Sequence, residues 1–309
     1  MDRRKFISIA AALATKAAMP ANLKAQASAP VSALTPETRG LPDLVAVKGG
    51  SPVQMFDRAI TALGGIENFV KPDQKVLIKP NIGWARTPEE GANTSPELVG
   101  HLVSLCLKAG AKEVKVFDNT CNDWQQCYLL SGIEKAVLEA GGKILPANSA
   151  SYFTEVDLPN GKILKKAMVH NAWLEADSII NVPILKSHGG ARMTSALKNL
   201  MGVIWDRRYY HRNGLHQCIA DFATFNKKPT LNVIDAYNVM MRNGPRGTST
   251  ADLARKMFMI LSPDMVAADT AASAIMNLSP DDITYIGMAT EHGVGVSQLK
   301  NLKIERLSI

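Results

Sequence analysis

The sequence has little cysteine, few aromatic residues and no long hydrophobic run. Four cysteines occur in 309 residues, and their spacing fits neither a zinc ribbon nor the cysteine run of an iron–sulfur protein. No uninterrupted apolar stretch approaches the roughly 18 residues of a membrane-spanning helix. The apolar content of 46% is ordinary for a globular protein. We therefore expect no iron–sulfur cluster of the chain's own and no stable membrane span, and the composition does not support the collagen-like, repeat or disordered classes.

The first 27 residues have the layout of a bacterial export signal. The paired Arg3 and Arg4 precede a mild, alanine-rich apolar segment, and the small residues Ala-Gln-Ala at 25–27 offer a cleavage site. This pattern is similar to the twin-arginine type of signal peptide. We expect residues 1–27 to be removed after export by the twin-arginine machinery, which would leave the mature chain in the periplasm. A frayed amphipathic helix is the alternative interpretation.

The basic character of the chain lies largely in this segment. Residues 1–27 contain five cations and one anion, so their removal lowers the formal net charge from +7 to +3. The remaining charge is small, and the rest of the sequence contains no basic stripe with interleaved aromatic residues. We therefore expect no nucleic acid partner.

Beyond residue 45 the chain alternates patterns typical of strands and helices. Residues 28–45 are rich in Ala, Ser and Pro and are predicted to be a flexible leader. Two alternating runs around Asn160 and Gly161 predict a β-hairpin. The sequence predicts a single α/β domain over 46–309, with a mostly parallel sheet, helices on both faces and a small β-hairpin insertion. Strands are predicted at 75–79, 113–117, 178–185 and 231–234, and helices at 56–63, 96–109, 132–140 and 266–276.

Polar side chains stand at the carboxyl ends of four predicted strands, where ligands bind in open parallel sheets. Each residue alone also has a structural interpretation, because an aspartate could cap a turn and a lysine could reach solvent. Together they predict one site at this edge of the sheet, where we expect Lys79, Asn81, Asp118 and Asp235 to contact a substrate or cofactor. The strands and their ends are KVLIKPN with Lys79 and Asn81, EVKVFDN with Asp118, SIINVPILKSH with Lys186 and His188, and LNVIDA with Asp235.

A glycine pair and a helical pattern follow His188. Gly189 and Gly190 would let backbone N–H groups approach a ligand closely. The helix that comes next carries Lys198 and Asn199, and its apolar residues have the spacing of a face that packs on the core. We expect Gly189, Gly190 and Asn199 to contribute to cofactor binding.

The start of this helix predicts an electropositive pocket. Thr194 or Ser195 could cap the helix, and a helix N-terminus attracts anions. Lys186 and Lys198 would strengthen that attraction, which suits a carboxylate, a phosphate or an acidic cofactor. An ordinary amphipathic helix with surface lysines is the alternative.

Side chains of metal-binding types occur between 188 and 221, but their spacing matches no recognised metal signature. The candidate ligands for a metal ion are His188, His211, His216 and Asp221. Neutral His188 could instead act as a general base, since its unperturbed pKa is about 6.5. In an oxidising compartment Cys121 and Cys127 could pair across a loop, or could remain ordinary free thiols.

Seven motifs occur in a fixed order: VLIKPNIGW, TSPELVGHLVSLCLKAGAKEVKVFD, IINVPILKSH, SALKNLMGVI, HRNGLHQCIADF, LNVIDAYNVMMRNGP and SPDMVAADTAASAIM. With them the chain resembles the DUF362 family over about residues 45–296. This resemblance implies an α/β fold. Many members of the family carry a ferredoxin-like cysteine cluster, which suggests redox work, and this chain lacks that cluster.

A second resemblance is confined to Lys186, His188 and Lys198. A Lys-x-His pattern followed by a lysine ten residues after the histidine is similar to the cofactor-binding stretch of the nickel-pincer lactate racemase family. The resemblance implies that Lys198 would hold an organic cofactor and that His188 would take part in proton or hydride transfer. A later histidine departs from the pattern, because His211 and His216 lie on either side of the expected position.

These observations predict an exported enzyme that acts on a small anionic substrate. Its chemistry would be that of an oxidoreductase or isomerase and could depend on a metal ion or an anionic organic cofactor. Lys186 and Lys198 would hold the anion, His188 would move a proton, and Asp118 and Asp235 would position a substrate or a cation. The alternative is a non-catalytic periplasmic binding protein for an anionic solute or cofactor.

Overall fold

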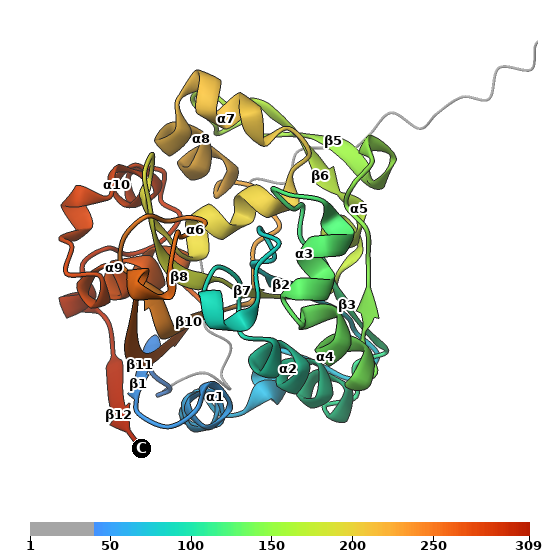
Figure 1. Cartoon of the computed structure of the whole chain (residues 1–309). Coiled ribbons are helices and arrows are strands. Elements are labelled where there is room, and N and C mark those ends of the chain that lie inside the picture. The colour runs from blue at the N-terminus through green and yellow to red at the C-terminus, as the bar shows by residue number, and fades with distance from the viewer. Residues whose placement is uncertain (1–39) are drawn as a thin grey trace, which may run out of the picture. The chain divides into compact units, whose positions relative to one another are not determined.

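The computed structural model describes residues 40–309, so the predicted export signal and most of the predicted leader lie outside the described part. In this part the chain builds a ten-stranded sheet and a separate two-stranded sheet. Helices lie on both sides of the large sheet (Figure 1), and none of them is long and apolar enough to cross a membrane. The prediction of an α/β fold with helices on both faces is therefore confirmed.

The large sheet has the order β12-β1-β11-β10-β7-β2-β3-β4, with β8 and β9 attached beside β10. Most neighbouring strands are parallel, as predicted, whereas β11 is antiparallel to both β10 and β1. The strands are β1 (Leu44–Lys48), β2 (Lys75–Pro80), β3 (Glu113–Val116), β4 (Lys143–Ile144), β7 (Ser178–Val182), β8 (Ile184–His188), β9 (Arg192–Thr194), β10 (Leu231–Met240), β11 (Leu253–Ser262) and β12 (Ile304–Ser308).

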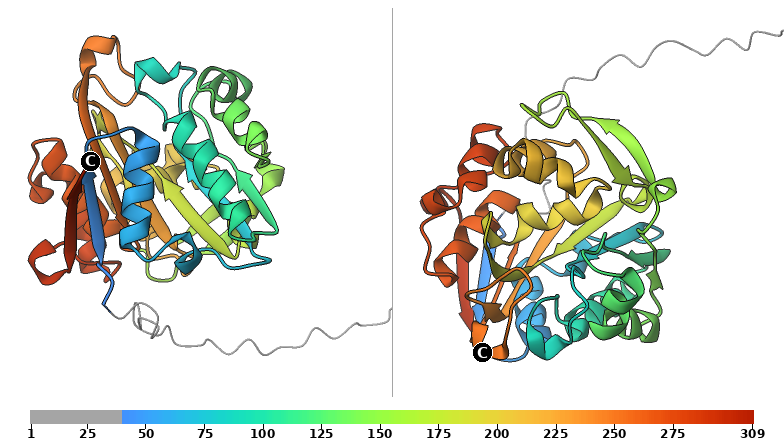
Figure 2. Two further views of the ribbon diagram at one scale, coloured as in Figure 1. Left: turned by 90° about the horizontal axis from the view of Figure 1, so that it is seen from below. Right: turned by 45° about the horizontal axis from the view of Figure 1, so that its top comes forward.

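Side chains along each strand alternate between two hydrophobic cores, one on each face of the sheet. In β2, Val76 and Ile78 belong to one core and Leu77 to the other. Figure 2 shows the helix layers that cover these faces. The first core contains α1 (Pro52–Ala62), α2 (Pro96–Lys108), α3 (Trp124–Leu130) and α4 (Ile133–Glu139). The second contains α5 (Asn171–Glu175), α6 (Ala196–Asn199), α7 (Arg207–Asn213), α8 (Leu215–Phe222), α9 (Met265–Ile275) and α10 (Thr284–Glu291).

Two element boundaries differ from the sequence-based expectation. The strand predicted at 178–185 is divided at Pro183 into β7 and β8, because proline has no N–H to donate to a neighbouring strand. The sheet also begins earlier than expected, since Leu44 and Val45 are buried in β1 at the end of the predicted leader.

The predicted β-hairpin is present as the two-stranded sheet. β5 (Phe153–Asp157) pairs antiparallel with β6 (Lys166–His170), with Phe153 opposite His170. Residues 158–165 connect the strands, so the connection is longer than the tight turn that Asn160 and Gly161 alone would make. The carboxylate of Asp221 holds this connection, because it accepts hydrogen bonds from the N–H groups of Ile163 and Leu164 at 2.7 and 2.8 Å.

Four asparagines link the strands where the site lies, and we call them the asparagine ladder. Asn81 donates to Asn199 at 3.0 Å, Asn199 donates to Asn181 at 2.8 Å, and Asn181 donates to Asn232 at 2.9 Å. Asn232 then donates to the carbonyl of Ser262 in β11. A buried amide needs partners for its donors and its acceptor. The ladder meets this need and ties α6 to β2, β7 and β10.

Candidate functional site

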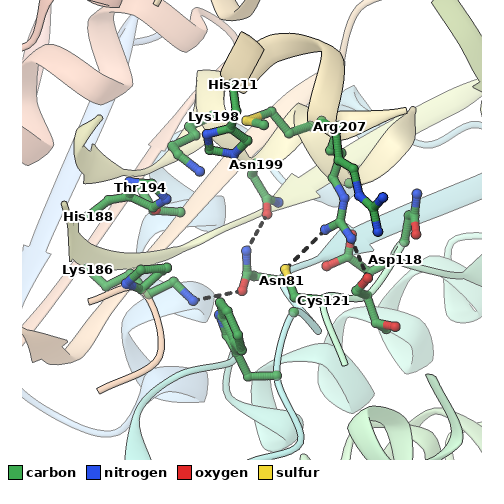
Figure 3. A pocket seen from close by; sticks show the side chains of 18 of the residues that line it. Asn81, Asp118, Cys121, Lys186, His188, Thr194, Lys198, Asn199, Arg207 and His211 are labelled. Atoms are coloured by element: carbon green, nitrogen blue, oxygen red, sulfur yellow. Dashed lines mark hydrogen bonds between the residues drawn. The ribbon is translucent and has the colours of Figure 1, made fainter. Parts of the chain in front are cut away.

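A cavity of about 920 Å³ lies at the carboxyl ends of β2, β3 and β8 (Figure 3). Most of its wall comes from the loops after β2 and β3, from β8, and from α6 and α7. The predicted site residues that line it are Asn81, Asp118, Lys186, His188, Lys198, Asn199 and His211. Those that do not line it are Lys79, Gly189, Gly190, His216, Asp221 and Asp235.

Lys79 lies beneath the cavity, fully buried in an ion pair with Asp118. Lys79 Nζ is 2.8 Å from Asp118 Oδ1, and it also donates to the carbonyl of Pro80 and to Asn199 Oδ1. Asp118 Oδ2 accepts the N–H of Ile82 at 2.7 Å. Burial lowers the pKa of Lys79, while the neighbouring carboxylate of Asp118 opposes that change. Lys79 therefore supports the floor of the cavity and does not face a ligand.

Gly202 packs directly against this ion pair. A Cβ atom built at Gly202 would stand 1.8 Å from Asp118 Oδ1 and 2.7 Å from Lys79 Nζ. The carbonyl of Gly202 also accepts the N–H of Asn119 at 3.0 Å. Only a residue without a side chain fits here while the ion pair is formed.

Lys186 is a buried lysine whose ammonium group reaches the edge of the cavity. It donates to Asn81 Oδ1 at 3.0 Å (Figure 3). It also donates to the carbonyl of Ala92. No carboxylate forms an ion pair with it among residues 40–309. Burial, with a smaller contribution from the nearby charge of Lys198, lowers the pKa of Lys186 to about 7. Lys186 is therefore charged in only part of the molecules near neutral pH.

Lys198 projects into the cavity from α6. Its amine has no hydrogen-bond or ion-pair partner in the part of the chain that the structure describes. Burial lowers the pKa of Lys198 to about 8, and the charges of Arg207 and Lys79 act in the same direction. An amine of this kind can bind an anion when protonated and accept a proton when neutral.

His188 is held as a neutral ring of defined tautomer. Its Nδ1 accepts the N–H groups of Gly190 and Ala191, both at 3.1 Å. A nitrogen that accepts these bonds carries no proton, so the proton of the neutral ring is on Nε2. Burial, together with Lys198 and Lys186, lowers the pKa of His188 to about 3. This geometry favours a hydrogen-bond donor at Nε2 over the general base expected from the sequence.

The helix after the glycine pair is shorter than the sequence pattern suggests. α6 covers only Ala196–Asn199 and continues as a 3₁₀ turn over Leu200–Val203. Its N-terminus is not open to an anionic ligand, because the buried carboxylate of Asp269 accepts the N–H groups of Ala196 and Leu197. Neither Thr194 nor Ser195 caps it through its side chain. The expectation that this helix start binds an anionic ligand is therefore wrong. Lys186 and Lys198 do line the cavity, but the N–H groups at the helix start are bound by Asp269.

The four candidate metal ligands do not come together. Asp221 is bonded to the hairpin connection and to His292, whose Nε2 is 3.0 Å from Asp221 Oδ1. His216 stacks on Tyr285, and His211 lines the cavity. Among residues 40–309, no group of three or more His, Cys, Asp or Glu side chains is placed to hold a metal ion.

Three further predicted residues lie outside the cavity wall. Asp235 is buried and accepts hydrogen bonds from the N–H groups of Ser95 and Tyr237. It therefore fixes the start of α2 and does not bind a ligand. Gly190 donates to His188, and Gly189 lies exposed beside it, outside the cavity wall.

The structure adds residues to the site that the sequence patterns did not single out as ligand contacts. Arg207 and Trp205 enter the cavity from the segment before and at the start of α7, and Trp84 enters from the loop after β2. Cys121 also lines the cavity, and all four cysteines are free thiols. Trp205 and Arg207 belong to the run WDRRYY. The spacing of residues in this run does not predict that it packs against the carboxyl ends of the strands.

Comparisons with known proteins find similarity over the part of the chain that forms the cavity. A family model described as "Domain of unknown function (DUF362)" matches residues 76–274, a range that contains the whole cavity wall. The thylakoid-associated protein sll1697 of Synechocystis sp. is 27% identical over 259 residues, which cover 81% of this chain and 77% of that protein.

Two solved structures are similar at a lower level. One is the lactate racemase apoprotein of Thermoanaerobacterium thermosaccharolyticum, 12% identical with a TM-score of 0.48, covering 74% of this chain and 56% of that one. The other is a protein of Thermotoga maritima, 11% identical with a TM-score of 0.48, covering 74% of this chain and 60% of that one. This chain thus spans less than two thirds of either protein.

The contact between Gly202 and the ion pair gives a testable prediction. We expect Gly202→Ala to separate Lys79 from Asp118 and to lower the free energy of unfolding by roughly 3–5 kcal/mol, the cost of breaking a buried ion pair. Chemical denaturation measures this change. The matched control is Gly189→Ala, because a Cβ at Gly189 meets no atom within 4 Å. Equal stability of the two variants would contradict the tight packing.

Proposed function

This chain belongs to the DUF362 family, and we propose that it is an enzyme that removes a proton from the carbon next to a small substrate's carboxylate, a reaction of the isomerase class. The observation that carries this proposal is Lys198, an amine without a partner whose pKa is about 8, facing a cavity lined by cationic groups.

The charge of the cavity favours an anionic ligand. Lys186, Lys198, Arg207 and Arg208 line it, whereas its wall contains only two carboxylates, Asp118 and Asp206. Lys79 balances Asp118, and Asp206 is occupied by the N–H groups of Arg208 and Tyr209 at the start of α7. Asp206 is thus the one wall carboxylate without a buried lysine beside it, so the four basic side chains outnumber the negative charge that the wall leaves uncompensated, and a bound carboxylate would offset the excess.

Proton transfer is assigned to Lys198. A general base works best when its pKa lies near the working pH, and burial brings the pKa of Lys198 into that range. The amides of Gly190 and Ala191 bind Nδ1 of His188, so the Nε2–H group on the other side of the ring is directed away from them. It would donate to the carboxylate oxygen on which negative charge builds as the proton leaves.

A non-catalytic binding protein for an anionic solute is the second candidate function. Lys186 and Asn81 are already fixed by hydrogen bonds, so the anion-binding wall is pre-organised without any chemical step. This candidate requires the cations of the wall and does not require the amine of Lys198 to lose its proton.

The cavity also has room for an anionic organic cofactor. Its volume is within the range of pockets that hold drug-sized ligands, roughly 300–1,000 Å³. In that arrangement Lys198 and Arg207 would hold the acidic groups of the molecule, and Lys198 would not be the base. The molecule would supply an electron-accepting centre next to the substrate. A metal ion would need ligands from this molecule as well, because the described residues offer no set of three.

We also propose export through the twin-arginine machinery, based on Arg3, Arg4 and the segment up to residue 27. Protein purified from the periplasm of its native host is expected to begin at Ser28. The intact mass and metal content of the same preparation report any bound cofactor or metal. A chain that keeps Arg3 and Arg4 and stays in the cytoplasm would contradict the export proposal.

Anion binding is expected to depend on pH through the two cavity lysines. Both are charged below their pKa values, so the affinity for sulfate should be highest below pH 7 and fall as the pH rises through about 7 and about 8. His188 stays neutral over this range and adds no step. Isothermal titration with sulfate, whose own charge is constant here, measures the profile. A sulfate affinity that does not change with pH would show that the two lysines do not bind the anion.

Deuterium exchange tests the proposed reaction. Small 2-hydroxy carboxylates incubated with the wild-type protein in D₂O should exchange the hydrogen on the carbon next to the carboxylate, as followed by proton NMR. Lys198→Met should slow this exchange by about 100-fold or more, the usual contribution of a general base. The matched control is Lys108→Met, an exposed lysine on α2 outside the cavity.

The outcomes of this experiment separate the two candidate functions. Stabilisation of the wild-type protein by the carboxylates without any exchange would favour the binding protein. Exchange that continues unchanged in Lys198→Met would show that another group is the base.

A further inference from the structure

Cys121 is a free thiol in the wall of the cavity, opposite the side from which Lys198 enters (Figure 3). It lies in the loop after β3, and its N–H donates to the carbonyl of Gly83 at 2.8 Å, which fixes its backbone. The side chain of Cys121 is exposed, whereas Cys106, Cys127 and Cys218 are buried. Cys121 is thus the thiol of the described chain that a ligand in the cavity can reach.

Cationic groups surround this thiol. Arg207 Nη1 donates to Cys121 Sγ at 3.2 Å. A charge on Cys121 would also raise the pKa values of Lys186 and Lys198, so the sulfur is within electrostatic reach of both lysines. A guanidinium beside a thiol stabilises the thiolate that remains after the thiol gives up its proton.

A second observation points to a ligand in the same place. Thr194 lines the cavity with only 2% of its surface exposed, and its Oγ1 has no hydrogen-bond partner within residues 40–309. An unpaired buried hydroxyl costs free energy. A ligand with an oxygen atom between Thr194 and the lysines would satisfy it, and that ligand would lie next to Cys121.

We propose that Cys121 is the second acid–base group of the reaction, so that the enzyme inverts the configuration of its substrate. This inference rests on the proposed function. The amine of Lys198 takes the proton from the carbon next to the carboxylate, and the electron pair of the broken C–H bond passes into an enolate. The thiol of Cys121 then donates its proton to the same carbon from the opposite face.

The products of this step are an ammonium group on Lys198, a thiolate on Cys121 and the mirror-image substrate. Arg207 stabilises the thiolate. The reverse reaction uses the same two groups with their roles exchanged, and proton exchange with water restores the starting state. The step needs no oxidant, reductant or further reactant.

Alkylation tests whether Cys121 shares the anion site. The full chain is treated in parallel with iodoacetate, a small carboxylate, and with neutral iodoacetamide, and the modification of Cys121 is followed by peptide mass spectrometry. The ratio of the two rates removes the effect of thiol ionisation, because both reagents attack the same thiolate. We expect Arg207→Gln and Lys198→Met to lower this ratio by about tenfold through lost electrostatic attraction.

The matched control is Arg212→Gln, which removes an exposed arginine of α7 that does not line the cavity. The ratio should not change in this variant. A ratio that is the same in the wild type, Arg207→Gln and Lys198→Met would place Cys121 outside the anion site and overturn the inference.

A second experiment tests the acid role. Single enantiomers of lactate, malate and glycerate are incubated in D₂O with the wild type, Cys121→Ser and Cys121→Ala, and both deuterium exchange and inversion are measured. We expect the Cys121 variants to lose inversion by about 100-fold or more while one enantiomer still exchanges its hydrogen through Lys198. Loss of inversion together with retained exchange is a result that general damage to the fold would not produce.

Different results would contradict the role of Cys121 and the proposed function. Inversion at the wild-type rate in both Cys121 variants would overturn the role of Cys121 and leave the proposed function standing. A wild type that exchanges none of these substrates would count against the proposed function itself, and the role of Cys121 would fall with it.

Discussion

The structure of the site depends on keeping one lysine buried and neutralised at the strand ends. Lys79 has no access to solvent, and its ammonium group is compensated by Asp118 and by Asn199 Oδ1. Asn199 also belongs to the asparagine ladder, so the same contact fixes α6 against β2 and β7. Lys198 precedes Asn199 in the chain and is thereby directed into the cavity. Gly202 completes the arrangement, because a side chain there would occupy the position of the ion pair.

The chemistry of the cavity follows from an imbalance of charge. Two lysines, two arginines and two carboxylates line the cavity; Asp118 is paired with the buried Lys79 beneath it, and Asp206 accepts backbone N–H groups at the start of α7. Burial without counter-charges brings the pKa values of Lys186 and Lys198 down to about 7 and about 8. The same property that draws an anion into the cavity therefore also produces an amine that can accept a proton near neutral pH.

Several polar residues that looked alike in sequence have different roles in the fold. Asp118 lines the cavity, whereas Asp235 and Asp221 hold backbone N–H groups elsewhere. Asp269 lies in a pattern that reads only as an apolar helix, yet it caps α6. A buried carboxylate satisfies its hydrogen bonds with whichever donors the packing brings near, and those donors come from segments distant in sequence.

The sequence by itself determined the fold class, the hairpin, and the placement of Asn81, Asp118, Lys186 and His188 at one edge of the sheet. These follow from local periodicity and from the rule that parallel strands share a carboxyl edge. Tertiary structure alone decided that Arg207 and Cys121 meet in the same cavity, that His188 is a neutral donor, and that the helix start faces Asp269. These properties depend on distances between residues far apart in the chain and on burial, and neither is encoded in the spacing of residues along the sequence.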